Sequence, residues 1–210
     1  MASRLGDQTA RMQGRVTLNP MYHVDPVGTL LFPALIIFGP LFGFTFFGGL
    51  LVGWAKPTPV ITRNFRKILR DDNLTTLAGP ASNLILVAVA FLVLLVICFA
   101  VPSGRMLVLA SLNGGLVLND SSGLQPIVVL AILAIEINLS LFFFNLLPIP
   151  PLDGSRVLHN VLPYNLAQSY DRINIWVSYL LMIFVGGYIL RLLLTPSLAL
   201  VFAPFVSLGR

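Results

Sequence analysis

One stretch of the chain combines residue types that could do chemistry at the edge of a membrane: FFFNLLPIPPLDGSRVLHN, residues 142–160. Asn145 lies at the end of an apolar run, three prolines then interrupt the backbone, and Asp153 follows. Backbone groups freed by prolines need hydrogen-bond partners that hydrocarbon does not offer. An acid at membrane depth is costly unless it is paired or binds a cation. Asp153 is therefore a candidate functional residue.

Asp153 also has a purely structural interpretation. Aspartate is a common helix N-cap, because its side chain can accept a hydrogen bond from a free backbone N–H of the first turn. The polar segment that follows predicts a short helix from Gly154 to about Val161. Spacing alone does not separate the capping role from the functional one.

The composition places these residues in an integral membrane protein. The chain is 57% hydrophobic and only 10% charged, whereas soluble domains have about 25% charged residues. The net charge of +5 comes from basic residues in loops beside apolar segments, where they set topology and meet anionic lipid. We therefore expect a lipid bilayer as the partner of this surface, and no nucleic acid.

The apolar runs predict an all-α integral membrane protein, a small helical bundle with about three full spans. These spans are Ala81–Val101, Pro126–Leu147 and Ile173–Leu194, each long enough for a bilayer core, which needs about 20 residues. A fourth run, Thr29–Trp54, is interrupted by Gly39-Pro40 and has basic segments on both sides. A simple span would place those basic segments on opposite faces, so we expect a broken or re-entrant segment here.

The remaining segments are expected to be connections. Residues 102–125 predict a loop, whose few cations suit the outer side of the membrane. Residues 63–73, RNFRKILRDDN, predict a short interfacial helix with cations on one side. Pro196 is expected to end the last span, which leaves residues 197–208 as an apolar segment too short to cross the bilayer.

Two further polar side chains lie within predicted spans. Asn83 follows Pro80 near the start of its span, where a first-turn position at a helix N-terminus accounts for it; an amide facing a cavity is the alternative. Glu136 lies near the middle of the next span, where an acid is a functional-site hypothesis by default and would suit a small transporter or channel. Ser140, four residues on, could instead hold a protonated Glu136 by a local hydrogen bond.

These positions are expected to converge. Asn83 and Asp153 both lie at the cytoplasmic ends of predicted spans, and Asn145 lies slightly deeper. Spans that run antiparallel can bring such residues together. Their common level in the membrane favours a shared site over three separate structural roles.

Several segments resemble those of a known family. NLLPIPPLDGSRVL, residues 145–158, resembles the third motif of the site-2 protease family, which are membrane-embedded zinc metalloproteases. AGPASNLIL, residues 78–86, is similar to the second motif, and residues 4–20, HVDPVGTLLFP and GWAKPTPV are similar to the short bacterial branch. The resemblance covers residue 4 to about residue 194. It implies one membrane-embedded peptidase-like domain over residues 1–210.

The resemblance also implies roles for the candidate residues. Asp153 would be the carboxylate ligand of a catalytic Zn²⁺. Asn83 and Asn145 would line the cleft and hydrogen-bond the unwound backbone of a transmembrane protein substrate. The protein would be a multi-pass protein of the bacterial inner membrane, with its site near the cytoplasmic face.

The rest of the family's site is a helix carrying H-E-x-x-H, whose two histidines bind zinc and whose glutamate is the general base. These 210 residues contain no such motif, because His23 and His159 lie far apart and neither precedes a glutamate. No residue of the chain is therefore assigned as catalytic. One carboxylate does not make a catalytic zinc site, which has three protein ligands, so Zn²⁺ is expected from the family but doubtful for this chain alone.

Two explanations follow. In the family the missing motif comes just before the segment that resembles residues 4–7, so a start upstream of Met1 would supply it. The intact GPASN and LDG segments favour this explanation, and the domain would then be N-terminally incomplete as given. The alternative is a non-catalytic membrane module that binds a transmembrane partner in the same cleft.

Overall fold

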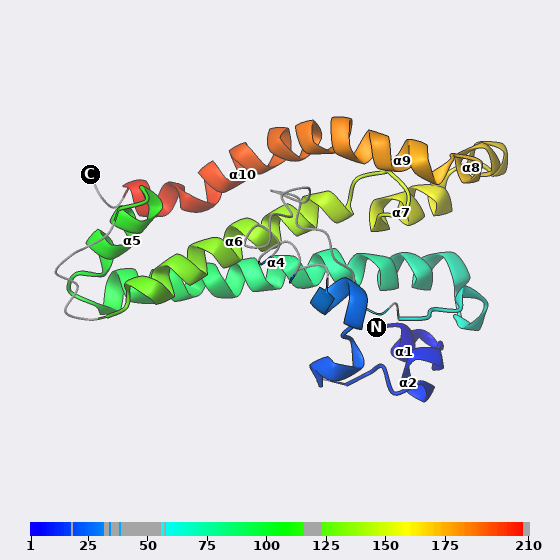
Figure 1. Ribbon diagram of the computed structural model, residues 1–210, viewed down its shortest axis with the longest axis horizontal. Coiled ribbons are helices and arrows are strands. Elements are labelled where there is room, and N and C mark those ends of the chain that lie inside the picture. The colour runs from blue at the N-terminus through cyan, green and yellow to red at the C-terminus, as the bar shows by residue number, and fades with distance from the viewer. Residues whose placement is uncertain are drawn as a thin grey trace. The chain divides into compact units, whose positions relative to one another are not determined.

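The computed structural model describes residues 1–17, 19–31, 34, 38, 56, 58–115 and 123–207. The chain divides into two compact units, Met1–Asp72 and Asn73–Arg210. The regular elements of the described residues are helices (Figure 1). The expected re-entrant segment, Thr29–Trp54, lies almost entirely outside the described residues, so it stays a prediction.

The first unit is made of short helices. They are α1 (Ala2–Leu5), α2 (Thr9–Met12), the 3₁₀ helix η1 (Pro20–Tyr22), the π-helix η2 (Pro26–Leu31) and the 3₁₀ helix η4 (Thr62–Asn64). Such short helices have few internal hydrogen bonds, so contacts between distant residues must hold them together.

A buried carboxylate, Asp7, joins the two ends of this unit. It accepts hydrogen bonds from the backbone and hydroxyl of Thr9, from the Ile61 backbone N–H at 2.9 Å, and from the Asn64 side-chain amide at 3.0 Å. Gly6 precedes it with a φ of 122°, and a Cβ there would lie 2.7 Å from the Asn64 carbonyl oxygen. The Thr9 bond foremost, with those from Asn64 and Ile61, holds the pKa of Asp7 well below its ordinary value despite burial.

The second unit contains the long helices. In order they are α4 (Ile68–Ala100, which begins in the first unit), α5 (Gly104–Leu112), α6 (Gln125–Asn145), α7 (Asp153–Val161), α8 (Tyr164–Asp171), α9 (Ile175–Leu181), the π-helix η5 (Met182–Gly186) and α10 (Gly187–Ser207). Three stretches are long and apolar enough to cross a membrane: Ile68–Ala100, Gln125–Asn145 and Ile175–Ser207. The predicted helical membrane bundle with three spans is confirmed.

The bounds of two spans differ from the prediction at prolines. The first begins at Ile68, so the expected interfacial helix is its first part, and Pro80 lies inside it. The last continues through Pro196 to Ser207, so the expectation that Pro196 ends it was wrong. A helix broken within hydrocarbon would expose unpaired backbone groups. Beside Pro196, the Thr195 and Ser197 hydroxyls bond carbonyls one turn back, at 2.9 and 2.7 Å.

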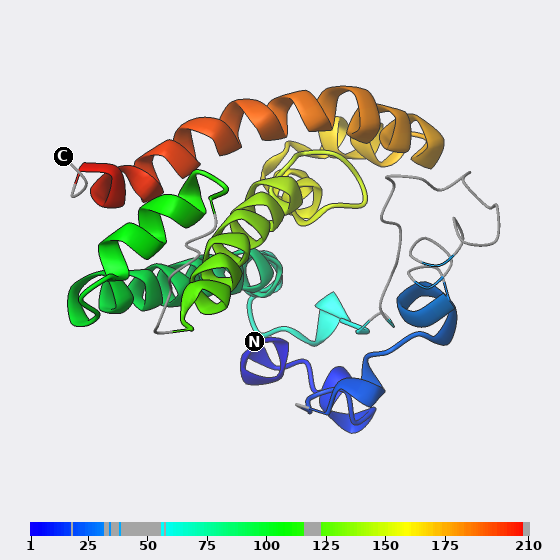
Figure 2. The same ribbon diagram turned by 60° about the vertical axis from the view of Figure 1, so that its left-hand side comes forward.

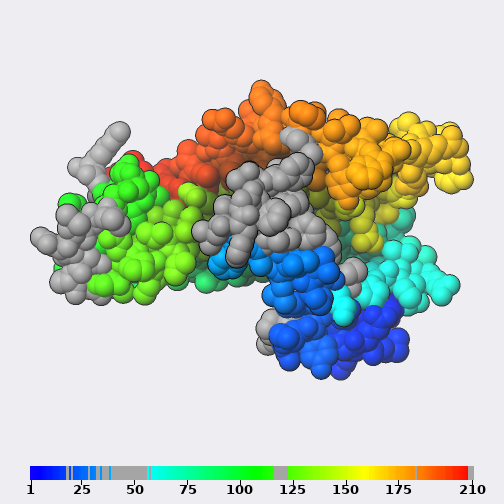
Figure 3. Space-filling model, in the orientation of Figure 1, coloured from blue at the N-terminus to red at the C-terminus, as the bar shows by residue number. Residues whose placement is uncertain are grey.

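The expected loop at residues 102–125 contains a helix, α5, because its apolar side chains complete the core. Leu107 and Val108 are fully buried, and with Leu94 of α4, Ile135 of α6 and Phe205 of α10 they belong to one hydrophobic cluster. Figures 1 and 2 show α4 and α6 side by side, with α5 and the end of α10 packed at one end of the pair. In the space-filling view, α10 lies along the green surface of α5 and α6 (Figure 3).

The start of α5 lies close to the backbone of α4, so a substitution at this point can test the packing. A Cβ at Gly104 would lie 1.9 Å from the Ile97 carbonyl oxygen, so Gly104→Ala must displace α5 and should lower the free energy of unfolding by about 1–3 kcal/mol. Gly187→Ala is the matched control, because its Cβ meets nothing within 4 Å, and it should be neutral or slightly stabilising. Thermal unfolding in detergent would measure both; equal effects would contradict the α4–α5 contact.

Low pH should destabilise the contact between Asp7 and the Ile61 segment of the first unit. The folded pKa of Asp7 is depressed below an unfolded value of about 3.9, so its stabilisation is complete above about pH 4 and is lost as the pH falls below that value. Hydrogen exchange at the Ile61 amide, which donates to Asp7, would measure this. In Asp7→Asn, the Ile61 amide should exchange faster than in the wild type at neutral pH. Its exchange should not accelerate further as the pH falls below about 4. If the ratio of the Ile61 exchange rates in the two proteins does not change with pH, the ionised carboxylate of Asp7 does not stabilise the position of Ile61.

Candidate metal and substrate-binding site

The candidate site forms where the chain leaves α6. That helix ends at Asn145, and residues 146–152 form a compact loop that leads into α7 at Asp153. Several of the loop's N–H groups are satisfied within the loop, from Ile149 to the Leu147 carbonyl at 2.8 Å and from Leu152 to the Ile149 carbonyl at 2.9 Å. These bonds let a proline-rich segment fold back on itself without depending on solvent.

Gly154 sets the position of Asp153 relative to α6. A Cβ at Gly154 would lie 2.1 Å from the Leu146 carbonyl oxygen and 2.7 Å from that of Leu147. Only glycine therefore allows the start of α7 to lie against the backbone that follows α6. Ser155 is buried beside it and donates to the Leu152 carbonyl at 2.6 Å. The Asp-Gly-Ser order thus has a packing reason at each position after the acid.

Tyr170 of α8 holds the other end of the loop. Its hydroxyl donates to the Pro148 carbonyl at 2.9 Å. Partial burial raises the pKa of the Tyr170 hydroxyl, and its interaction with the Ser155 side chain opposes this rise. Sequence reasoning did not find Tyr170, because nothing local marks a residue that acts on a loop some twenty positions earlier.

Asp153 does not cap α7, so the capping alternative that the sequence left open is not what the structure shows. The N-cap is Leu152, Asp153 is the first helical residue, and the cap makes no side-chain hydrogen bond. The Asp153 carboxylate is half-buried and has no hydrogen bond to the described part of the chain. Burial raises the pKa of this carboxyl, and the Arg156 guanidinium opposes the rise. A carboxylate in this setting is available to a ligand.

The Gly-Pro segment of α4 lies beside this carboxylate. A Cβ at Gly79 would be 3.4 Å from Asp153 Oδ2, so the absence of a side chain leaves room at the acid. A second link between α4 and α7 is a hydrogen bond that Asn160 Nδ2 donates to Asn73 Oδ1 at 2.7 Å. Helix α4 therefore approaches the Asp153 segment at Gly79. The expected convergence of Asn83 and Asn145 with Asp153 stays a prediction.

Asn83 lies one helical turn beyond Gly79, so the two residues share a face of α4. The prediction that Asn83 occupies a helix N-terminus was wrong, because α4 begins at Ile68. Its neighbour Ser82 donates to the Gly79 carbonyl at 2.6 Å, as polar residues in membrane helices commonly do. The Asn83 side chain makes no such bond to the residues that the structure describes.

Asn145 is the last residue of α6, and its half-buried amide also has no hydrogen bond within the described ranges. Asn138, two turns earlier on the same helix, shows the usual alternative, because its amide donates to the Ala134 carbonyl at 2.8 Å. Asn83 and Asn145 thus have amide groups without a partner in the part of the chain that the structure describes, as a substrate-binding role requires. That role stays a prediction.

The two histidines of the chain lie in other interactions. His23 bonds the Thr17 carbonyl at 3.0 Å, and His159 pairs with Asp171 at 3.1 Å. Among the described residues, no three His, Cys, Asp or Glu side chains gather closely enough to hold a metal ion. Asp153 fits a zinc site as one carboxylate ligand, but the donor set present here does not fit a catalytic zinc by itself.

Glu136 is not joined to this site by any described contact. The local hydrogen bond between its carboxyl and Ser140, one of the two alternatives that the sequence left open, is not formed, because the Ser140 hydroxyl donates instead to the backbone carbonyl of Glu136 at 2.7 Å. Hydroxyls in helices commonly bond the carbonyl one turn back, which leaves the carboxyl of Glu136 to other partners.

The spans and the half-buried carboxylate of Asp153 define a multi-pass membrane protein with a metal-ligand candidate at a helix start. The sequence model of Peptidase family M50 matches residues 66–186, and the chain belongs to that family. It is 36% identical over 210 residues to "Putative zinc metalloprotease YwhC" of Bacillus subtilis (strain 168), with all of this chain and 78% of that protein aligned. No solved structure matches significantly. The resemblance to the site-2 protease family is confirmed.

A pair of cysteines can test the contact between α4 and Asp153. With Cys98 replaced by alanine, the Gly79→Cys and Asp153→Cys pair should form an intramolecular disulfide under mild oxidation, because the two side chains start within reach of each other. Gly79→Cys with Val161→Cys is the matched control, since Val161 ends α7, about 12 Å along the helix axis from Asp153. Comparable oxidation of both pairs would contradict the contact.

Proposed function

We propose that this protein acts as a zinc-dependent intramembrane endopeptidase of the site-2 type, which hydrolyses a peptide bond in a transmembrane protein. The observation that carries the proposal is the Asp153 carboxylate, half-buried, without a hydrogen bond in the described chain, and adjacent to Gly79. The family match and the name of the Bacillus relative support the metallopeptidase class.

In this proposal the two asparagines bind the substrate backbone. A transmembrane helix must unwind before a peptide bond becomes accessible, and each unwound residue then exposes N–H and C=O groups. Such groups are costly in an apolar environment unless they are paired. An amide side chain offers both a donor and an acceptor, so Asn83 and Asn145 can pair with an extended segment that lies between α4 and the end of α6.

Asp153 would hold the metal as its carboxylate ligand. A complete site needs two more protein ligands and a general base, which these 210 residues do not provide. The alternative is a non-catalytic module that binds a transmembrane partner at the same residues. It is favoured by the absence of a three-ligand cluster among the described residues.

We also propose a location for the site. The basic residues around the start of α4, which are Arg63, Arg66, Lys67 and Arg70, favour the cytoplasmic side for this end of the helix. Asp153 packs beside Gly79, one-third of the way along that helix. The site then lies near the cytoplasmic face of the bacterial inner membrane.

The proposal predicts that Asp153→Ala removes both metal and cleavage. Protein isolated from its native membrane should contain about one zinc per chain, and Asp153→Ala should lose the zinc and lower cleavage of a transmembrane substrate by about a hundredfold or more. Asp171→Ala is the control, because Asp171 is an exposed acid paired with His159, and it should keep both.

The intact mass of the same sample separates the two functions. A mass above 22.9 kDa together with zinc supports the peptidase. A mass of 22.9 kDa without zinc, and partner capture that survives a chelator, supports the non-catalytic module. Normal cleavage by Asp153→Ala would reject the assignment of this residue.

A further inference from the structure

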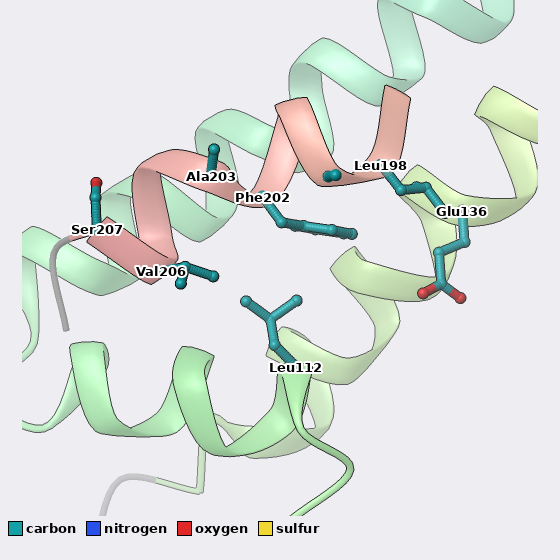
Figure 4. Close-up of a pocket in the computed structure, with 8 residues that line it drawn as sticks. Leu112, Glu136, Leu198, Phe202, Ala203, Val206 and Ser207 are labelled. Atoms are coloured by element: carbon teal, nitrogen blue, oxygen red, sulfur yellow. The ribbon is translucent and has the colours of Figure 1, made fainter. Parts of the chain in front are cut away.

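A groove with an acid at one end opens between three helices of the second unit. Its volume is about 570 Å³, and its lining includes Leu112 of α5, Glu136 of α6, and Leu198, Phe202, Ala203 and Val206 of α10. Figure 4 shows Phe202 and Leu198 on the α10 side, Leu112 opposite them, and the carboxylate of Glu136 at the end of the groove. Apart from Glu136 and the terminal Ser207, the lining side chains are apolar.

The side chain of Glu136 has no partner among the described residues, although its position calls for one. It lies near the middle of the α6 span, is half-buried, and its carboxyl has no hydrogen bond or ion pair within the described chain. An acid at such depth is costly unless it is paired or faces a wet cavity. The occupant of the groove is therefore expected to present a hydrogen-bond donor or a cation to Glu136.

A second cavity lies on the same face of α10. Its volume is about 420 Å³, and it is lined by Tyr188, Arg191, Leu192, Thr195 and Pro196. The α10 residues of both cavities recur at intervals of three and four positions, so they share one face. From residue 188 to residue 207 this face extends about 30 Å, which equals the thickness of the bilayer hydrocarbon. The small side chains of Ala199 and Ala203 on this face allow a helix backbone to approach closely.

Charge and geometry select the occupant. A lipid carries its polar group at the interface and offers only hydrocarbon at the depth of Glu136, so it leaves the acid unpaired. A second copy of the chain enters the membrane in the same orientation, and a twofold pairing of the α10 faces would place Arg191 against Arg191. A transmembrane helix of another protein can satisfy Glu136 and fill the full length of the face.

We propose that the groove between α5, α6 and α10 binds a single transmembrane helix of another protein, which places a basic or other hydrogen-bond-donating side chain against Glu136. None of the groove residues belongs to the Asp153 site. The proposal goes beyond the peptidase assignment and stands whether or not the protein cleaves anything.

A designed peptide can test this directly. The intact protein is reconstituted in lipid vesicles with a leucine-rich transmembrane peptide that carries one central lysine, or with the same peptide carrying leucine there, and association is followed by energy transfer between fluorophores. Wild-type protein should bind the lysine peptide about three- to thirtyfold more tightly than the leucine peptide, the range of interhelical hydrogen bonds in membranes. Glu136→Leu should abolish this preference and leave binding of the leucine peptide unchanged.

Two bulky substitutions on α10 distinguish peptide binding in the groove from peptide binding elsewhere on this helix. Ala203→Phe fills the groove and should weaken binding of both peptides. Leu200→Phe lies on an exposed position that does not line either cavity and should bind both as the wild type does. The proposal fails if the wild type does not prefer the lysine peptide, or if Leu200→Phe weakens binding as much as Ala203→Phe. It also fails if Glu136→Leu reduces self-association of the protein alone, which would identify a second copy as the occupant.

Discussion

Backbone hydrogen bonding in hydrocarbon is the constraint on which the rest of this structure depends. A spanning segment has no water to satisfy a free N–H or C=O, so α4 and α10 continue through Pro80 and Pro196 where a soluble helix would often end. Directly after the α6 span, residues 146–152 are not helical. There, hydrogen bonds within the loop and one from the Tyr170 hydroxyl replace the hydrogen bonds of a helix. The candidate site lies at this departure from the helix.

The same constraint sorts the polar side chains of the spans. Ser82, Asn138 and Ser140 bond carbonyls of their own helices, which accounts for them without any function. Asn83, Asn145 and Glu136 make no such bond within the described residues. Polar groups left unsatisfied at membrane depth need an external partner, which is why the proposals assign Asn83 and Asn145 to a bound segment and Glu136 to an occupant of the α10 groove.

The fold class and three spans could be predicted because hydropathy and length decide them almost alone. The ends of the spans could not, since whether a proline stops a helix depends on what surrounds it, as Pro196 shows. Asp153 was proposed from its chemistry, and its role stays a prediction. That it does not cap α7 and that it lies close to Gly79 result from tertiary packing, which a local sequence pattern does not reveal. Helix α5 was missed because Leu107 and Val108 become a core only when α6 and α10 are present.

The absence of a side chain at Gly154 constrains the length of the preceding loop as well as the contact between that loop and α7. Because the start of α7 lies directly on the carbonyls of Leu146 and Leu147, the loop between Asn145 and Asp153 cannot gain or lose a residue without moving glycine out of that position. A shift of one residue would also turn the side chains of α7 by about 100° and carry the carboxylate away from Gly79. The structure therefore constrains the number of residues in this loop more tightly than it constrains the identities of the loop's apolar side chains.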